Sequence, residues 1–224
     1  MYQIHRPEFD TNLDETLGAL TDLVRAGKVR YIGSSTFPAS LIVEGQWVAE
    51  KRGRERFVCE QPPYSILVRG VEQDVLPTCL RHGMGVIPWS PLAGGWLTGR
   101  YRKDAHLPET HRAQRIPARY DMSLPGNQLK LDAADALARL AEEAGMTLIE
   151  LALAFVLSHP AVTAPIIGPR TMEQLESQLG AAEVTLSDEL LDRIDEIVPP
   201  GVTLNRVDAG WQNPALEPGA RRRR

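Results

Sequence analysis

Cysteine is scarce in this sequence, which has two among its 224 residues, Cys59 and Cys79. Neither has a further cysteine or a histidine nearby at the spacing of metal ligands, so the sequence gives no support to a metal site. One cysteine falls in a predicted strand and the other in a predicted helix. We therefore expect both to be buried free thiols.

Long hydrophobic runs and a strong excess of one charge are also missing. No apolar stretch approaches the ~20 residues needed to span a bilayer, and the N-terminus has neither a basic lead nor an apolar signal core. We therefore expect a cytoplasmic protein without membrane contact. The formal net charge is −4, with acidic and basic residues mixed along the chain, which argues against a nucleic-acid partner and favours a small-molecule ligand.

Short apolar runs alternate with longer segments of helical period, a pattern typical of parallel βαβ units. The expected class is α/β, with one domain over residues 1–198 and a disordered tail over 199–224. The four arginines at 221–224 could form a patch for an anionic partner, but we expect them to be a solvated end without a role. We expect strands at 2–5, 29–33, 57–60, 86–89 and 162–167, and helices at 13–26, 39–52, 69–82, 128–144, 147–158, 171–179 and 187–197.

The segment 90–126 breaks this alternation. It is rich in Gly, Pro, Arg and His and has no convincing period of either kind. A segment that long inside a compact domain is usually functional or mobile, so we interpret it as a substrate-covering loop, with a disordered insertion as the alternative.

Five motifs then occur in a fixed order. They begin with MYQIHRPEFDTNLDETLGAL at 1–20 and continue with KVRYIGSSTF at 28–37, EQPPYS at 60–65, GVIPWSPLAGGWLTGRY at 85–101 and APIIGPRTMEQLESQLGA at 164–181. In wording and order they resemble the aldo/keto reductases. The resemblance implies part of a (β/α)8 barrel, namely five parallel strands with flanking helices plus C-terminal helices. No Gly-x-Gly-x-x-Gly fingerprint follows any predicted strand, so a Rossmann fold has no support.

The resemblance also implies a function and a cofactor. Aldo/keto reductases reduce aldehydes and ketones to alcohols with NADPH, so the expected partner is a small carbonyl compound that the sequence does not identify further. The alternative is a non-catalytic NADPH-binding protein, like the related subunits that accompany potassium channels.

In the family, three strand–helix units that carry an aspartate, a tyrosine and a lysine of the active site come before the part resembled here. Because a barrel of this kind typically needs ~250 residues, the length agrees with a partial barrel. We therefore expect no turnover by the 224-residue chain alone. We also expect poor solubility, or oligomers formed through the exposed edges of the first and last strands.

Site residues follow from the resemblance, position by position. His5 would orient the carbonyl group; taken alone, it could equally be a histidine at a strand edge. Ser35, Thr36 and Gln61 would hold the nicotinamide carboxamide, although the family has asparagine where Thr36 stands and the pair could simply begin the next helix.

Trp89 would stack on the nicotinamide ring, with core filling as its alternative. The backbone at Ser90, Leu92 and Gly94 would approach the pyrophosphate. Near the N-terminus of the helix at 171–179, the adenosine 2′-phosphate and adenine would meet Gly168, Arg170, Gln174 and Gln178. Many family members carry Glu-Asn where Ser177 and Gln178 stand, and Arg170 could instead be a solvated residue of the first helical turn.

Overall fold

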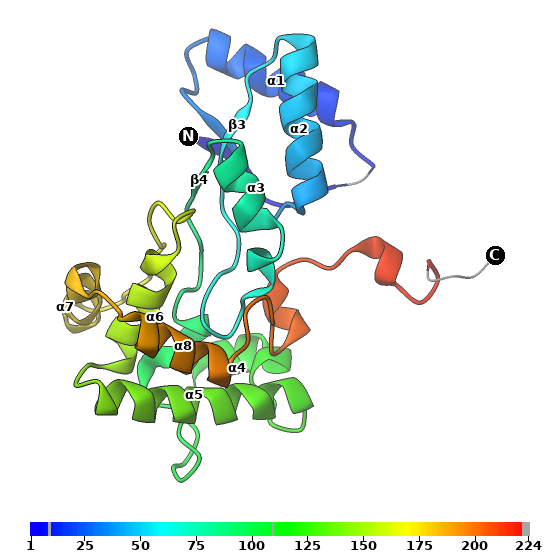
Figure 1. The fold of residues 1–224 in the computed structure, drawn as a ribbon. Helices are drawn as coiled ribbons and strands as arrows, with labels where there is room; N and C mark the ends of the chain where they lie inside the picture. The colour runs from blue at the N-terminus through cyan, green and yellow to red at the C-terminus, as the bar shows by residue number, and fades with distance from the viewer. Residues whose placement is uncertain (9, 109, 221–224) are drawn as a thin grey trace.

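The computed structural model describes residues 1–8, 10–108 and 110–220 (Figure 1). Its sheet consists of four parallel strands in chain order, which are β1 (Tyr2–Ile4), β2 (Ile32–Ser34), β3 (Phe57–Glu60) and β4 (Gly85–Val86). The expected α/β class with a parallel sheet is confirmed, and each strand carries its following residues to the same carboxyl edge.

The expected fifth strand at 162–167 is not formed as a strand. This segment touches β4 and the residues after it only through isolated parallel bridges, Val86 with Val162 and Trp89 with Ile166. Two prolines explain the interruption, because proline has no backbone N–H to donate to a ladder. Pro165 lies inside the segment, and Pro88 lies within the expected strand 86–89, which ends at Val86 instead.

Three helices follow the first three strands and pack against one another in chain order, α1 (Leu13–Arg25), α2 (Ala39–Arg52) and α3 (Val75–Arg81). The side chain of Asn12 caps α1 by accepting from the Asp14 N–H. The expected helix at 69–82 is divided, because a 3₁₀ turn, η1 (Gly70–Glu72), precedes α3. These helices form the upper layer in Figure 1.

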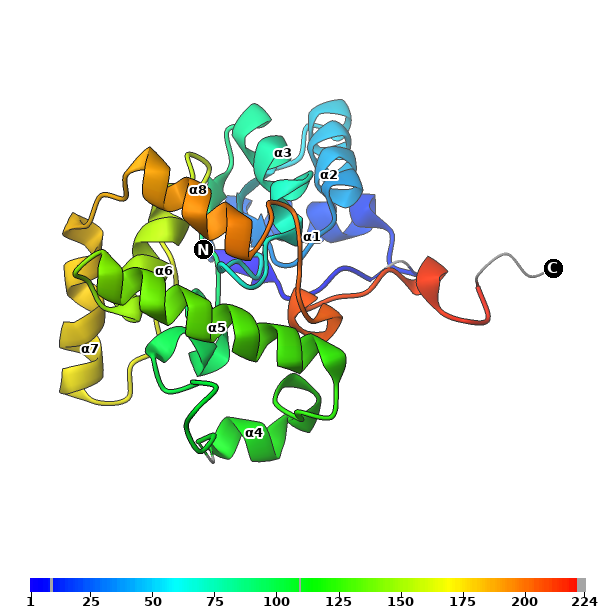
Figure 2. The same cartoon turned by 60° about the horizontal axis from the view of Figure 1, so that its bottom comes forward.

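A second helical layer comes from the C-terminal half and comprises α5 (Pro125–Glu143), α6 (Leu148–Ser158), α7 (Met172–Leu179) and α8 (Asp188–Ile197). Thr147 and Glu150 form the capping box expected at the start of α6. In both views α7 lies outside α6, on the side of the molecule away from α1 and α2 (Figures 1 and 2).

The segment 90–126 contains short helices joined by irregular stretches. It contains η2 (Ala93–Thr98), α4 (His111–Arg115) and η3 (Pro117–Arg119), and α5 already begins at Pro125. Trp96 and Tyr101 are buried and stacked with ring centroids 4.2 Å apart. The alternative interpretation as a disordered insertion is therefore wrong for the described part of this segment, because Trp96 and Tyr101 pack into the hydrophobic core.

The tail also departs from expectation in its first part. The backbone N–H of Arg69 donates to the carbonyl of Val202 at 2.9 Å, and a 3₁₀ turn, η5 (Arg206–Ala209), packs near η3. Residues 199–211 are thus attached to the body. Residues 212–220, which include η6 (Pro214–Leu216), are exposed and lead away from it (Figure 1), and the arginines at 221–224 lie outside the described residues.

Both cysteines are buried free thiols, as expected. Gly33 shows how closely the strands approach, since a Cβ there would lie 2.7 Å from the carbonyl oxygen of Cys59. Only glycine fits that position without moving β3. Among the described residues, no helix combines the length and the apolar character required to cross a membrane.

Candidate functional site

The carboxyl edge of the sheet gathers four of the residues expected from the sequence. Ser35 and Thr36 follow β2, Gln61 follows β3 and Trp89 follows the β4 segment. Ser35 and Thr36 are buried, and Gln61 and Trp89 are half-buried. The sheet therefore brings polar donors and acceptors together with an indole ring, from three separate motifs.

The turn after β2 is fixed by the residues after β3. The Ser35 hydroxyl donates to the Gln61 carbonyl at 2.8 Å, and the Thr36 N–H donates to the same oxygen at 3.2 Å. Thr36 has a φ of +58°, a left-handed conformation that a β-branched residue rarely adopts. These two bonds hold the turn in that strained shape.

The side chain of Gln61 points toward β1. Its Nε2 donates to Oε1 of Gln3 at 3.1 Å, and Gln3 in turn donates to the carbonyl of Ser34 at 3.4 Å. These bonds leave the side-chain carbonyl oxygen of Gln61 available as an acceptor. The edge thus offers one amide oxygen and two hydroxyls, the kinds of group that pair with a carboxamide.

Glu60 lies beneath this turn and is fully buried. Its carboxylate accepts from the Ser34 hydroxyl at 2.5 Å and from the Phe37 N–H at 3.2 Å. Burial raises the pKa of Glu60 to about 7, and the hydrogen bonds from Ser34 and Phe37 oppose that rise. A carboxyl group that titrates near neutrality therefore stands directly behind the Ser35–Thr36 turn.

Trp89 is approached from both ends of the chain. The Arg6 guanidinium carbon lies 5.8 Å from the ring centroid, and the Arg119 guanidinium carbon lies 5.9 Å away. Gly210 packs on the benzo part of the ring, since a Cβ there would lie 2.7 Å from Cζ2. The indole Nε1 is buried without a hydrogen-bond partner among the described residues.

Arg6 ties Trp89 to the turn. Its Nη1 donates to the Thr36 hydroxyl at 3.1 Å and to the carbonyl of His5 at 2.7 Å. The pKa of Arg6 is lowered by burial and then by the positive charge of Arg119, with the negative charge of Glu60 acting in the opposite direction. The guanidinium remains a cation, as arginine does in proteins.

The turn that follows Trp89 is rich in left-handed backbone. Ser90, Ala93 and Gly94 have φ values of +58°, +49° and +70°. Successive N–H groups in such turns form concavities that bind anions. Leu92 is half-buried between them and accepts from the Gly95 N–H at 2.8 Å, so the tight turn is closed by its own backbone.

The third group of expected residues lies at the start of α7, apart from the Trp89 cluster. Gly168 and Arg170 are exposed there. The Gln174 side chain accepts from the Arg170 N–H at 2.8 Å, and Nε2 of the buried Gln178 donates to the Gln174 carbonyl at 2.8 Å. Both glutamines therefore form hydrogen bonds within the α7 region, and Arg170 precedes the N-cap residue of α7, Thr171.

His5 follows β1 at the same carboxyl edge and is exposed. Its role in orienting a carbonyl group stays a prediction.

Several residues at the site were missed by the sequence analysis, namely Gln3, Arg6, Glu60, Arg119, Asp208 and Gly210. Gln3 and Glu60 carried a usable signal, because each is polar within a short, otherwise apolar strand segment.

The space beside Trp89 is small. A cavity of about 20 Å³ is lined by Trp89, Gly94, Arg119, Tyr120 and Asp208, among others, and is large enough for about one water molecule. In the part of the chain that the structure describes, no group of three or more His, Cys, Asp or Glu side chains is placed to hold a metal ion.

The comparisons with known proteins agree with the motifs. Residues 1–199 match the model of the aldo/keto reductase family. The chain is 41% identical over 202 residues to an uncharacterized oxidoreductase, YrpG, of Bacillus subtilis, covering 90% of this chain and 59% of that protein. It is 34% identical over 199 residues to a putative voltage-gated potassium channel subunit beta of Schizosaccharomyces pombe, covering 87% and 57%.

An aryl-alcohol dehydrogenase [NADP(+)] of Phanerodontia chrysosporium is 28% identical over 200 residues, which cover 89% of this chain and 51% of that enzyme. The chain thus spans little more than half the length of these relatives.

Proposed function

Because the chain belongs to the aldo/keto reductase family, whose model matches residues 1–199, we propose that it forms the nicotinamide-binding part of an NADPH-dependent oxidoreductase that interconverts carbonyl compounds and alcohols. The observation that carries the proposal is the cluster at the carboxyl edge of the sheet. There the buried Ser35 and Thr36 donate to the backbone carbonyl of Gln61, and Thr36 and Trp89 both lie against Gly210.

The donor set fits a nicotinamide. Its carboxamide requires both a hydrogen-bond donor and an acceptor, and hydroxyls with an amide oxygen supply them. Its ring requires a flat apolar partner, which the indole of Trp89 provides. The cavity of about 20 Å³ beside Trp89 does not hold a nicotinamide ring, and Arg6 and Gly210 already contact the indole, so the proposal includes a rearrangement of the residues around this ring on binding.

The phosphates have two places to bind. The left-handed turn at Ser90, Ala93 and Gly94 presents N–H groups for the pyrophosphate. Arg170 stands at the start of α7, where the helix dipole also favours an anion, and we assign it to the 2′-phosphate that distinguishes NADPH from NADH. The similarity to the aryl-alcohol dehydrogenase [NADP(+)] of Phanerodontia chrysosporium supports this choice.

The cofactor, when bound, supplies the hydride. We assign to His5 the orientation of the carbonyl oxygen, because it is exposed at the same edge. The family's proton donor and the lysine and aspartate that tune it match no position among these residues. We therefore propose that this chain by itself binds NADPH without turnover of a test aldehyde.

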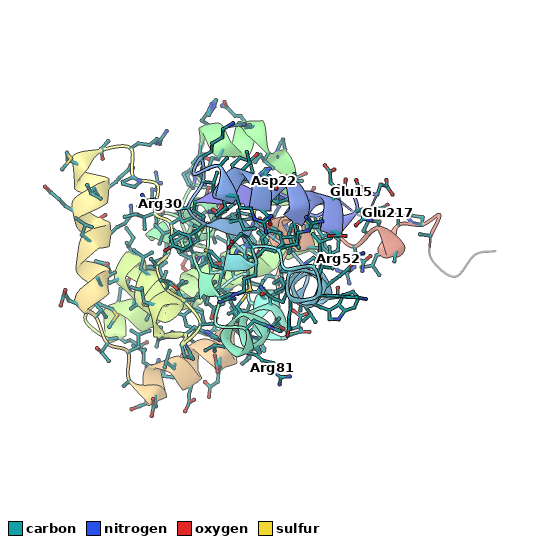
Figure 3. All side chains as sticks on the ribbon, turned by 90° about the horizontal axis from the view of Figure 1, so that it is seen from above. Glu15, Asp22, Arg30, Arg52, Arg81 and Glu217 are labelled. Carbon is teal, nitrogen blue, oxygen red and sulfur yellow. The ribbon has the colours of Figure 1, made fainter. Side chains whose placement is uncertain are left out.

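The test is a titration of the purified chain with NADPH and with NADH, followed by quenching of tryptophan fluorescence. We expect saturable binding that is stronger for NADPH. Arg170→Ala should remove the preference and leave NADH binding unchanged. The control is Arg81→Ala, since Arg81 is exposed on the outer side of α3 (Figure 3). Absence of saturable binding, or equal binding of both cofactors by the wild-type chain, would contradict the proposal.

A second candidate is a cofactor-binding subunit without catalysis. The observation in its favour is the similarity to a putative potassium channel beta subunit, at 34% identity. Both candidates predict NADPH binding. Turnover of an aldehyde by the longest open reading frame that contains this sequence would favour the enzyme, and its absence would favour the subunit.

A further inference from the structure

One buried ionisable group at the site has no role in the function proposed above. Glu60 has no exposed surface, and its carboxylate accepts hydrogen bonds from the Ser34 hydroxyl and from the Phe37 N–H. Those two residues flank Ser35 and Thr36. A buried carboxylate costs free energy unless it is satisfied, so its presence here calls for a compensating use.

The geometry assigns one. The neighbouring Gln61 carbonyl accepts from Ser35 and Thr36, and the Glu60 carboxylate accepts from the residues before and after them. Thus all four residues of the 34–37 turn donate to two consecutive residues, Glu60 at the end of β3 and Gln61 directly after it. The strained φ of +58° at Thr36 persists because the turn is fixed at each of its residues.

We propose that Glu60 is the positioning residue of the nicotinamide site: it holds the 34–37 turn in the shape that presents Ser35 and Thr36 to the cofactor, and its negative charge favours the cationic oxidised ring over the neutral reduced ring. This inference rests on the proposed function. Its second part follows from Coulomb's law, because only the oxidised ring carries a charge with which an ionised Glu60 can interact.

The charged and titratable groups coupled to Glu60 come from three elements packed around it. Arg6 lies in the loop after β1, Cys59 precedes Glu60 in β3, and Cys79 lies on α3. Burial raises the pKa of Cys59 to about 11 and that of Cys79 to about 12, so both stay neutral between pH 5 and 9. Arg6 stays charged throughout. Of this group, only Glu60 changes its charge in that range, since its pKa is raised to about 7.

The experiment measures the dissociation constants of NADP⁺ and NADPH on the full 224-residue chain from pH 5.5 to 8.5. The two cofactors carry the same 2′-phosphate, so its titration largely cancels in the ratio of the constants. We expect the affinity for NADP⁺ relative to NADPH to rise about tenfold as the pH increases, with a midpoint near pH 7. A tenfold change in this ratio corresponds to a difference of about one unit between the pKa values of Glu60 in the two complexes.

Glu60→Gln should make this ratio independent of pH. It should also weaken the binding of both cofactors, because the side-chain nitrogen of glutamine cannot replace the second carboxylate oxygen as a hydrogen-bond acceptor. Glu44→Gln removes the same charge from the exposed side of α2 and should retain the wild-type profile. Ser34→Ala keeps the carboxylate but removes a hydrogen bond that lowers its pKa, so the midpoint should move to higher pH.

A wild-type ratio that does not vary with pH, or a Glu60→Gln ratio that varies as in wild type, overturns the inference. If Glu60→Gln does not fold, the Ser34→Ala midpoint decides, and an unmoved midpoint overturns it. If neither cofactor binds at any pH, the proposed function itself is refuted. This outcome is distinguishable from binding without the expected pH dependence, which overturns only the role of Glu60.

Discussion

The clearest energetic prediction concerns the buried ion pair that attaches the tail. Lys130 on α5 is 1% exposed, and its Nζ donates to Oδ2 of Asp208 and to the carbonyl of Arg119, both at 2.8 Å. The ammonium also lies 4.7 Å from the centroid of Trp96. Burial lowers the pKa of Lys130, and the charge of Asp208 opposes that effect. We call Lys130, Asp208 and Arg119 the tail clasp.

Removing either partner should have unequal effects. Asp208→Asn leaves two cations, Lys130 and Arg119, beside each other without a counter-charge, which should cost about 3–5 kcal/mol, the range for breaking a buried pair. Lys130→Met leaves Asp208 paired with Arg119, whose Nε lies 3.2 Å from Oδ1. The methionine fills a similar volume against Trp96, so we expect this change to cost about 2 kcal/mol or less.

The assay is urea unfolding followed by circular dichroism and tryptophan fluorescence, on the wild type, both single variants and the double variant. The double variant should lose less than the sum of the single losses, with a coupling of about 1–3 kcal/mol. Equal losses in the two single variants, or additive losses, would refute the reasoning that Asp208 balances two cations.

Three further predictions concern the site and the core. The raised pKa of Glu60 means that its contribution to stability is complete below a pH of about 4.5 and is lost as the pH rises through about 7. Between pH 5 and 8, urea titrations should show the free energy of unfolding of the wild type falling by about 2–3 kcal/mol relative to that of Glu60→Gln, and a constant difference would contradict this. Gly210→Ala places a methyl group 2.7 Å from Cζ2 of Trp89 at a residue whose φ is +76°. It should therefore displace the segment, change the tryptophan emission and lower the free energy of unfolding by about 1–2 kcal/mol, whereas the control Gly219→Ala, where no atom lies within 4 Å of the added methyl group, should leave all three unchanged. Cys59 and Cys79, buried with raised pKa values, should react with an aromatic disulfide reagent at pH 8 only after urea unfolds the chain, and rapid labelling of the native chain would show that the β3–α3 region opens.

The sequence predicted the arrangement of the carboxyl edge because that arrangement follows from local patterns. Once strands are recognised as parallel, the residues that follow them must share an edge, and this brings Ser35, Gln61 and Trp89 together. The order of the strands and the alternation with helices required no further information.

Other features depend on contacts between residues far apart in the sequence. Lysine on an amphipathic helix is normally solvated, and nothing near Lys130 in the sequence indicates its pairing with Asp208. Likewise, Glu60 ends an apolar strand, but its inward orientation depends on Ser34 and Phe37 across the sheet. The fifth strand failed for a local reason that was present in the sequence, since Pro165 interrupts its ladder.

The packing around Trp89 has a consequence for how the protein folds as it is synthesised. Arg6 approaches the ring from near the start of the chain, and Gly210 covers part of it from near the end. The strands can pair as they leave the ribosome, because each lies beside its predecessor. The surroundings of Trp89 are complete only after residue 210 has emerged, and contacts of such large sequence separation form slowly. A nascent chain stalled before that residue would therefore hold a formed sheet with its indole still uncovered.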